Sequence, residues 1–169
     1  MHGLRICRAL VLVVCLVLSV KESQAQRMAV SADAVELLAL SPNVSFDLAF
    51  TQHHAFSVSL SASPWKISSN VYLRHLTWTP EYKYWLTMPF YKGYVGGKIM
   101  YSSYDFGVRD FSRKGNMIAA LADYGYSFII SKRWNIIPSV GLGAGCVMAE
   151  NIKYVPVVTL GVNAQIVLK

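Results

Sequence analysis

The stretch "AFSVSLSASP" at residues 55–64 decides the fold of this chain. Its apolar residues Phe56, Val58, Leu60 and Ala62 alternate with four serines. Successive side chains of a β-strand point to opposite faces of the sheet. The stretch is therefore predicted to be a strand with one apolar face and one face of small hydroxyl groups. The question that it raises is which of these two faces meets water.

The same period-two alternation recurs along most of the chain. It predicts eight strands, at residues 30–40, 44–50, 55–63, 76–86, 91–104, 118–130, 134–146 and 154–169. The first of them alternates least clearly. The connections at 51–54, 87–90 and 131–133 are short, whereas those at 64–75 and 105–116 are longer. Short turns at one end and longer loops at the other are typical of outer-membrane barrels.

Three prolines lie inside the predicted strands, at positions 80, 138 and 156. Proline has no N–H group to donate to a strand ladder. Each is expected to mark a rim or a bulge of the sheet.

The size of the polar side chains indicates which face lies inside a closed barrel. The polar face is built from small residues: Ser57, Ser59, Ser61, Gly125, Gly141, Gly143, Gly145 and Gly161. The interior of an eight-stranded barrel is just wide enough for side chains to fill, so small residues suit it. A soluble protein normally carries many charges outside, but this chain is 15% charged and 54% hydrophobic.

These features predict an all-β protein: a closed antiparallel up-and-down transmembrane β-barrel of eight strands. Aromatic residues near the strand ends fit the interfacial girdles of such barrels. They are Phe50, Phe56, Trp78, Tyr91, Phe128, Trp134 and Tyr154. The alternative is an exported soluble, lipocalin-like barrel whose apolar interior carries a small ligand.

The first 25 residues form a separate unit with the pattern of a cleaved signal peptide. Arg5 and Arg8 precede an apolar run at 9–20, and Ser23 and Ala25 fit a small-residue cleavage site. The run is shorter than the roughly 20 residues of a membrane anchor. We therefore expect residues 26–169 to be a single outer-membrane barrel domain. Cys146 is the one cysteine after the signal, so no internal disulfide is expected.

Six charged residues fall on the predicted inner face: Glu36, Asp47, Glu81, Lys83, Lys98 and Asp123. A buried charge is costly without a partner, so these residues are interpreted as a structural lumen of paired polar groups that plugs the barrel. Glu81 and Lys98 are expected within diagonal reach of each other. The alternative is a lumen that conducts ions or binds a ligand.

Catalytic, cofactor-binding and metal-binding residues are not predicted. One enzyme alternative, an outer-membrane lipid acyl hydrolase or transferase, depends on His75, Thr77 and Glu81, which combine a base with a hydroxyl group. His53 and His54 are interpreted as solvated turn residues.

The connection at 105–116 is the most charged one. It contains Asp105, Arg109, Asp110, Arg113 and Lys114 and is expected to be a solvated loop. Its arginines could contact lipopolysaccharide phosphates, because arginine binds phosphate well.

Three segments carry a resemblance to a known family. "LSPNVSFDLAF", "PEYKYWL" and "YGYSFIISKRWNIIPSVGLGAG" resemble an uncharacterised, domain-of-unknown-function family of small outer-membrane β-barrel proteins of Bacteroidota. The resemblance implies an outer-membrane barrel and offers no catalytic residues. Some relatives accompany surface fimbria proteins, which implies a class of partner.

The expected function is that of a non-enzymatic integral outer-membrane protein of a Gram-negative bacterium, with a structural or surface-interaction role. The expected partners are outer-membrane lipid, lipopolysaccharide and a surface or fimbrial protein. The modest excess of basic residues does not indicate a nucleic-acid partner.

Overall fold

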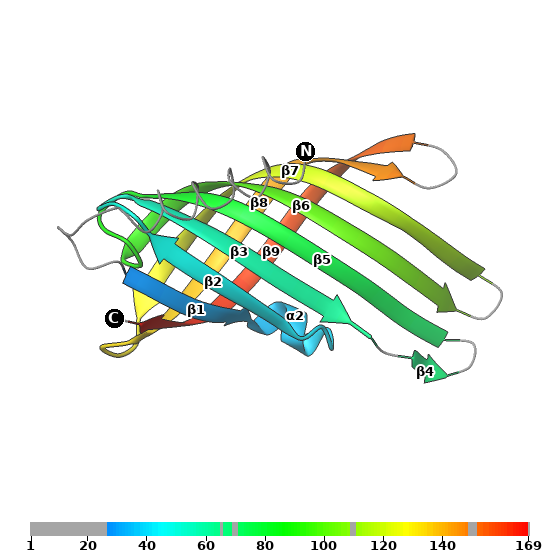
Figure 1. Ribbon diagram of the computed structural model, residues 1–169, viewed down its shortest axis with the longest axis horizontal. Helices are drawn as coiled ribbons and strands as arrows, with labels where there is room; N and C mark the ends of the chain where they lie inside the picture. The colour runs from blue at the N-terminus through cyan, green and yellow to red at the C-terminus, as the bar shows by residue number, and fades with distance from the viewer. Residues whose placement is uncertain (1–26, 65, 69–70, 109–110, 149–151, 169) are drawn as a thin grey trace, which may run out of the picture.

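The computed structural model describes residues 27–168, except 65, 69–70, 109–110 and 149–151 (Figure 1). The expected signal peptide, residues 1–25, lies outside this part. The elements are β1 (Arg27–Asp33), α2 (Ala34–Leu38), β2 (Asn43–Ala49), β3 (His54–Ser63), β4 (Lys66–Ser68), β5 (Val71–Trp85), β6 (Lys92–Val108), β7 (Phe111–Ile129), β8 (Trp134–Met148) and β9 (Ile152–Leu168).

The strands form one antiparallel sheet that closes on itself. Their order is β3-β2-β1-β9-β8-β7-β6-β5-β4, and a further pairing between β3 and β5 closes the barrel. Each barrel strand neighbours the strand before and after it in sequence, and β1 pairs with β9. The sequence-based prediction of an eight-stranded up-and-down barrel is confirmed. The short strand β4, which pairs only with β5, was not predicted.

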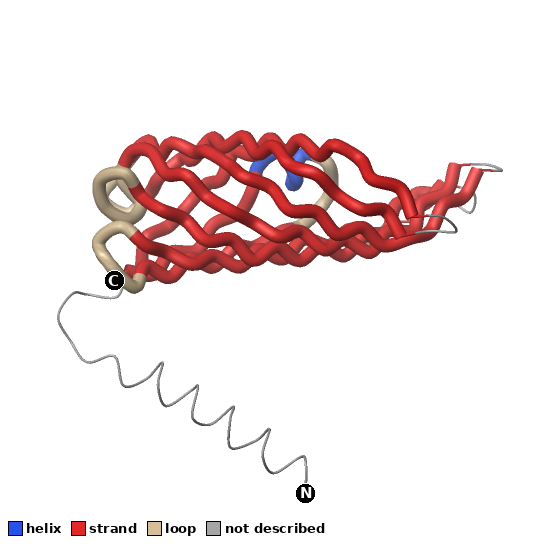
Figure 2. Tube along the Cα trace, turned by 90° about the horizontal axis from the view of Figure 1, so that it is seen from above, coloured by secondary structure: helices blue, strands red, loops and turns tan. Residues whose placement is uncertain are grey.

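The two ends of the barrel differ in construction. One end carries the connections 50–53, 86–91 and 130–133, and Met28 of β1 pairs there with Leu168 of β9. We call it the turn end; the opposite end, which carries α2 and β4, is the loop end. Figure 2 shows the turns gathered at one end and long strands reaching past α2 at the other.

The faces of β3 are arranged as its sequence indicates. Ser57, Ser61 and Ser63 are at most 6% exposed, whereas Phe56 and Leu60 are 44% and 48% exposed. Because one face of β3 is enclosed by the barrel and the other is not, the serines point inward and the apolar side chains point outward.

The predicted strand at 30–40 is wrong in its second half, where the chain forms the helix α2. Asp33 ends β1 and caps this helix: its carboxylate accepts hydrogen bonds from the backbone N–H groups of Val35 at 2.8 Å and Glu36 at 3.4 Å. An aspartate whose side chain bonds these N–H groups favours a helix start over a continuing strand. Among the described residues, no helix is long and apolar enough to cross a bilayer.

The predicted solvated loop at 105–116 is also wrong. β6 runs to Val108 and β7 starts at Phe111, so most of this segment is a strand hairpin. Asp105 pairs in register with Arg74 on one side and Lys114 on the other. Opposite charges at facing positions support pairing. Residues 109 and 110 lie outside the described part of the chain.

Two of the strand prolines lie where a ladder is interrupted. The β5–β6 pairs break off at Trp78–Tyr101 beside Pro80 and resume at Glu81–Lys98 in the same register. The β7–β8 pairs break off in the same way beside Pro138. Because the register is unchanged across each gap, these prolines remove ladder hydrogen bonds without the predicted bulge. Pro156 lies on β9 beyond its pairing with β1.

Gly143 allows β7 and β8 to approach closely. A Cβ atom at this position would overlap the carbonyl oxygen of Ala120 and lie 2.7 Å from the Cα atom of Leu121. Both are backbone atoms, which cannot move aside as a side chain can. We expect Gly143→Ala to lower the free energy of unfolding by about 1–3 kcal/mol, as overpacking does.

Urea unfolding of the refolded barrel measures this loss. Gly97→Ala is the matched control, because a Cβ atom there meets no atom within 4 Å. Equal losses for the two variants would contradict the steric argument.

Candidate functional site: the barrel interior

The inward residues of β5 run along the barrel axis and divide its interior into three zones. Trp85 lies toward the turn end, Lys83 and Glu81 follow, and Thr79 and Thr77 lie toward the loop end. From the turn end to the loop end, these zones are a cluster of aromatic rings that we call the aromatic plug, a network of charged side chains, and a cavity lined by hydroxyl groups.

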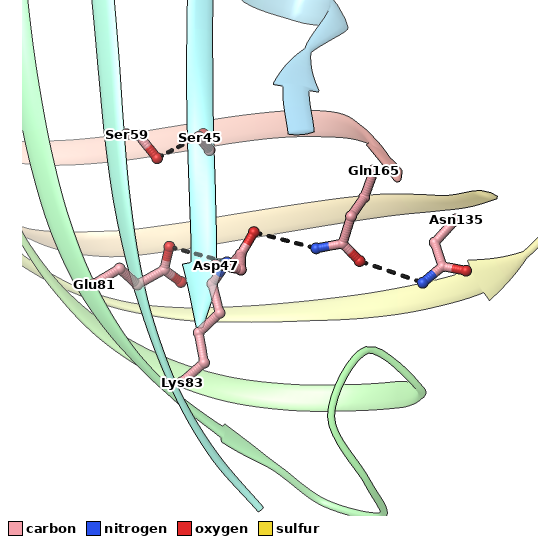
Figure 3. A network of polar contacts seen from close by, with 7 residues as sticks. All are labelled: Ser45, Asp47, Ser59, Glu81, Lys83, Asn135 and Gln165. Atoms are coloured by element: carbon pink, nitrogen blue, oxygen red, sulfur yellow. Dashed lines mark hydrogen bonds and ion pairs between the residues drawn. The ribbon is translucent and has the colours of Figure 1, made fainter. Parts of the chain in front are cut away.

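The charged network is centred on Lys83 (Figure 3). Its Nζ atom lies 2.8 Å from Oδ1 of Asp47 and 3.6 Å from Oε2 of Glu81. The Nε2 atom of Gln165 donates to the other oxygen of Asp47 at 3.2 Å, and Asn135 Nδ2 donates to Gln165 Oε1 at 3.3 Å. These five buried residues come from β2, β5, β8 and β9, so the network ties distant parts of the wall together.

The aromatic plug lies in the barrel interior at the turn end. The ring centroids of Phe90 and Tyr94 lie 5.7 and 4.9 Å from that of Trp85, and all three side chains are at most 3% exposed. Phe90 has a φ of 64°, a left-handed conformation that is rare outside glycine. Its carbonyl oxygen accepts hydrogen bonds from Ser127 at 2.8 Å and Asn135 at 3.0 Å. These two bonds hold the turn after β5 against the barrel interior.

Gly125 provides the space that the Tyr94 ring occupies. The three atoms closest to a Cβ at Gly125 all belong to the Tyr94 side chain. The Nζ atom of Lys83 lies 5.2 Å from the centroid of the same ring, within the range of a cation–π contact. The plug and the charged network are therefore in direct contact.

A cavity of about 120 Å³ lies on the loop-end side of the charged network. Most of its lining is polar: Asp33, Glu36, Asn43, Ser45, Ser59, Ser61, Thr77, Thr79, Glu81, Lys98, Ser139, Thr159 and Asn163, with Tyr94, Met100, Leu160 and Gly161. At its rim the side chain of Asn43 bonds the backbone of Asp33 twice: Asn43 Nδ2 donates to the Asp33 carbonyl at 2.9 Å, and Asn43 Oδ1 accepts from the Asp33 N–H group at 2.5 Å. This pair holds α2 beside the cavity.

The six predicted lumen residues differ in how deeply they are buried and in the elements that carry them. Asp47, Glu81, Lys83 and Asp123 are at most 8% exposed, whereas Lys98 is only partly buried. Glu36 is on α2 instead of a strand, although it still lines the cavity. Glu81 and Lys98 are directly opposite in the register, not diagonal. The close contacts join Asp47, Lys83 and Glu81.

Asp123 differs from the other buried charges because its side chain is hydrogen-bonded to a second carboxyl group, that of Glu81. Its Oδ1 atom and Oε1 of Glu81 lie 2.7 and 3.0 Å from the position of a Cβ atom on Gly96. Two carboxyl groups bond in this way when one of them is protonated. The buried hydroxyl of Thr159 has no hydrogen-bond partner among the described residues.

His75 and Thr77, the residues of the hydrolase alternative, form hydrogen bonds with different side chains. His75 Nε2 lies 3.4 Å from Ser61 Oγ, and Thr77 Oγ1 bonds Ser102 Oγ at 2.8 Å. No hydrogen bond in the described part of the chain joins His75 to Thr77, so the structure does not favour a nucleophile with its base here. Within the described residues, no three His, Cys, Asp or Glu side chains gather as metal ligands.

The two histidines of the first turn at the turn end contact aromatic residues. His53 Nδ1 lies 2.8 Å from the carbonyl oxygen of Trp85, and its ring stacks on Tyr84. His54 bonds the hydroxyl of Tyr82 and stacks on Phe50. They were predicted as solvated turn residues, and the structure shows them packed against rings.

Sequence reasoning missed the plug and the helix α2. Trp85 alternates on its strand with the same parity as Glu81 and Lys83, which puts it on the inner face. Alternation alone does not indicate that Phe90, from a turn, packs against it. For α2 a signal was present: Asp33 followed three residues later by Glu36 matches the spacing of a capping box.

Comparison with known proteins identifies the family. Residues 10–164 match the family described as "Protein of unknown function (DUF3575)". The chain belongs to this family. No curated protein matches the chain.

Two solved structures share the fold. The N-terminal β-barrel domain of Pseudomonas aeruginosa OprF has a TM-score of 0.54 and 11% identity, covering 85% of this chain and 99% of that one. Neisserial surface protein A (NspA) has a TM-score of 0.54 and 14% identity, covering 83% and 94%. At these identities the likeness concerns the fold, which is that of small outer-membrane β-barrels.

Proposed function

We propose that this chain is a non-enzymatic integral outer-membrane protein with a plugged interior. The observation that carries the proposal is the inverted distribution of side chains. Leu142 and Val158 on the outer face are more than 60% exposed, while Asp47 and Gln165 inside are fully buried. Exposed apolar surface of this extent marks contact with a membrane or a partner. A closed barrel also leaves no unpaired strand edge toward lipid.

The plugged interior is supported by the contacts inside the barrel. The aromatic plug closes the turn end, and the network around Lys83 crosses the lumen above it. Small barrels of this size have interiors that side chains can fill. The proposed role is structural or surface-interacting, with no flow of ions through the barrel.

Fractionation of the producing cells tests the membrane proposal. We expect the protein to stay with the outer membrane after high-salt and carbonate washing, because its apolar belt is surrounded by acyl chains. Its unheated form should migrate differently on gels from its boiled form, because the closed sheet resists detergent at room temperature. Recovery of intact protein in the periplasmic fraction would overturn the proposal.

The two alternatives lack a supporting observation. A lipocalin-like carrier needs an apolar interior, but the cavity here is lined mainly by hydroxyl and charged groups. An acyl hydrolase needs a base bonded to its nucleophile, and His75 and Thr77 bond different serines.

The proposed partners are lipopolysaccharide and a surface or fimbrial protein, in the outer membrane of a Gram-negative bacterium of the Bacteroidota. The loop end supports a contact surface, since β6 and β7 extend to Val108 and Phe111 and carry Asp105 and Lys114 on facing positions. Binding functions of rigid barrels usually reside at such ends. The fimbrial partner rests on the family resemblance alone. Crosslinking in intact outer membranes followed by purification of the barrel identifies the bound protein.

A further inference from the structure

We propose that β9 offers a docking site for an extended segment of another protein, which pairs with β9 as an added strand between Ile152 and Leu160. The inference rests on the surface-interacting role proposed above and deepens it, because it names the site and the kind of partner. Three observations carry it. They are a strand edge beyond the end of β1, exposed apolar side chains on the same stretch, and charges at its two ends.

The first observation is an edge of β9 that no other strand of the described chain covers. β1 pairs with β9 only from Leu168 to Asn163, because the chain leaves the sheet at Asp33 and forms α2. β9 continues to Ile152, paired on its other side with β8 (Figure 1). We call the side of β9 that faces away from β8 between Ile152 and Leu160 the free edge. α2 lies beside β9, but a helix does not pair with a strand edge.

The direction of the backbone groups on β9 follows from two hydrogen bonds. The N–H group of Val167 donates to the carbonyl oxygen of Arg133, on the β8 side, at 2.8 Å. The N–H group of Val162 donates to Oδ1 of Asp33, on the β1 side, at 3.3 Å. Backbone groups alternate in direction along a strand, so the odd-numbered residues bond β8 and the even-numbered residues face the free edge. Pro156 is even-numbered, and its missing N–H group therefore removes no bond of the β8–β9 ladder.

The N–H groups of Tyr154, Val158 and Leu160 are the donors of the free edge. Among the described residues, none of these three groups has a partner. Pro156 interrupts the row, which limits uncontrolled pairing between strand edges. The remaining donors and the carbonyl groups beside them still match the hydrogen-bonding pattern of an added strand, and such main-chain bonds supply the affinity in strand addition.

The second observation is the exposure of apolar side chains on the same stretch. Those more than 60% exposed are Ile152, Tyr154, Val158 and Leu160. A membrane strand needs about 9–11 residues, so a count from Leu168 at the turn end places Val158 near the outer boundary of the hydrocarbon and Tyr154 beyond it. Unpaired N–H groups are costly in lipid, and contiguous apolar side chains are costly in water. A partner strand removes both costs, since it bonds the edge and shields the side chains.

The third observation is a difference in charge between the two ends of the free edge. Lys153 is exposed at one end, and Asp33 and Glu36 lie at the other end, where β1 stops and α2 starts. A segment antiparallel to β9 continues the direction of β1, so its amino end lies beside the two acidic residues and its carboxyl end beside Lys153. Charge complementarity therefore favours an extended apolar segment with a basic residue at its amino end and an acidic residue at its carboxyl end.

A second copy of this chain does not fit the free edge within one membrane. Antiparallel pairing of the same edge of two copies requires a twofold axis perpendicular to the sheet, which turns the second barrel upside down. Parallel pairing inclines the two barrel axes by about twice the strand tilt of 35–45°. Copies inserted in one membrane share one orientation, so the occupant is a segment of a different protein.

Fluorescence anisotropy of a labelled peptide with the chain refolded in detergent micelles tests the proposal. The peptide is Lys-Thr-Val-Thr-Val-Thr-Val-Thr-Glu, which is as long as the free edge. We expect saturable binding. Hydrogen exchange at the N–H groups of Tyr154, Val158 and Leu160 should slow at least about tenfold in the complex, because each group donates to the peptide. A peptide with its lysine and glutamate exchanged should bind several-fold more weakly.

Val158→Pro separates the free edge from the barrel. It removes a free-edge donor and no bond to β8, so the barrel should fold, which the gel shift between unheated and boiled samples checks. Peptide binding should weaken at least about tenfold, because proline cannot donate to an added strand. Leu142→Ala is the matched control, since Leu142 is similarly exposed and faces Val158 from β8, on the far side of β9 from the peptide. Its peptide affinity should equal that of the unchanged chain.

Four results would overturn the proposal. Three are the absence of saturable binding up to about 1 mM peptide, equal binding by Val158→Pro, and equal binding of the peptide with exchanged ends. The fourth is slow exchange at the free edge before peptide is added, together with the mass of two chains, which would assign the edge to a second copy. Cell fractionation tests the outer-membrane role separately, so a chain that stays in the outer membrane and fails these binding tests overturns this inference alone.

Discussion

Replacing Asp47 with alanine is expected to lower the free energy of unfolding by about 3–5 kcal/mol, which is the cost of breaking a buried ion pair by removing one partner. Asp47 is fully buried and lies 2.8 Å from Lys83. Its other oxygen accepts a hydrogen bond from Gln165. The substitution leaves Glu81 at 3.6 Å as the ion-pair partner of the Lys83 ammonium group in the described part of the chain. It also leaves the Gln165 amide without this acceptor.

Urea unfolding of the refolded barrel measures this loss. Lys83→Met should cost a similar amount, and the double variant Asp47→Ala/Lys83→Met should cost clearly less than the two single losses together, because the effects of substituting two residues in contact are not additive. Lys132→Met in the exposed turn after β7 is the control and should change the free energy of unfolding by no more than about 0.5 kcal/mol. A loss for Asp47→Ala no larger than this control would show that the network does not stabilise the barrel.

Replacing Trp85 with alanine is expected to cost about 3–5 kcal/mol, as large-to-small substitutions of buried tryptophan do. Trp85 is fully buried between Phe90 and Tyr94, so its removal leaves a cavity in the plug. Trp85→Phe should cost much less, since the indole Nε1 atom has no hydrogen-bond partner among the described residues. Trp78→Ala is the matched control on the same strand, because Trp78 is 47% exposed on the outer face.

Planar-bilayer recordings test whether these rings close the barrel. The unchanged protein should show no ion conductance, and the double variant Trp85→Ala/Phe90→Ala should show more, because two of the three rings that close the turn end are removed. A clear conductance of the unchanged protein would contradict the plugged interior.

Much of the fold could be predicted because the barrel imposes period two on every strand. In β3 the serines lie inside and Phe56 and Leu60 outside, as the alternation indicates. The observed secondary structure differs from the prediction where a local interaction is stronger than the period-two alternation. Asp33 caps α2 with its own side chain, which ends the strand. Asp105 and Lys114 face each other in a hairpin, so a charged segment forms strand where loop was predicted.

Alternation along each strand is a local property. The sequence by itself therefore determined an all-β barrel with small polar residues inside and apolar residues outside. The inner-face position of Asp47, Glu81, Lys83 and Asp123 follows from the same pattern. Which of these charges meet was decided only by the tertiary structure. The register and the closure between β3 and β5 bring β2, β5 and β9 together, so that Asp47 binds Lys83 and Gln165. The pairing of β5, β6 and β7 places Asp123 facing Glu81 over Gly96, because contacts between strands depend on register and curvature that no single strand contains.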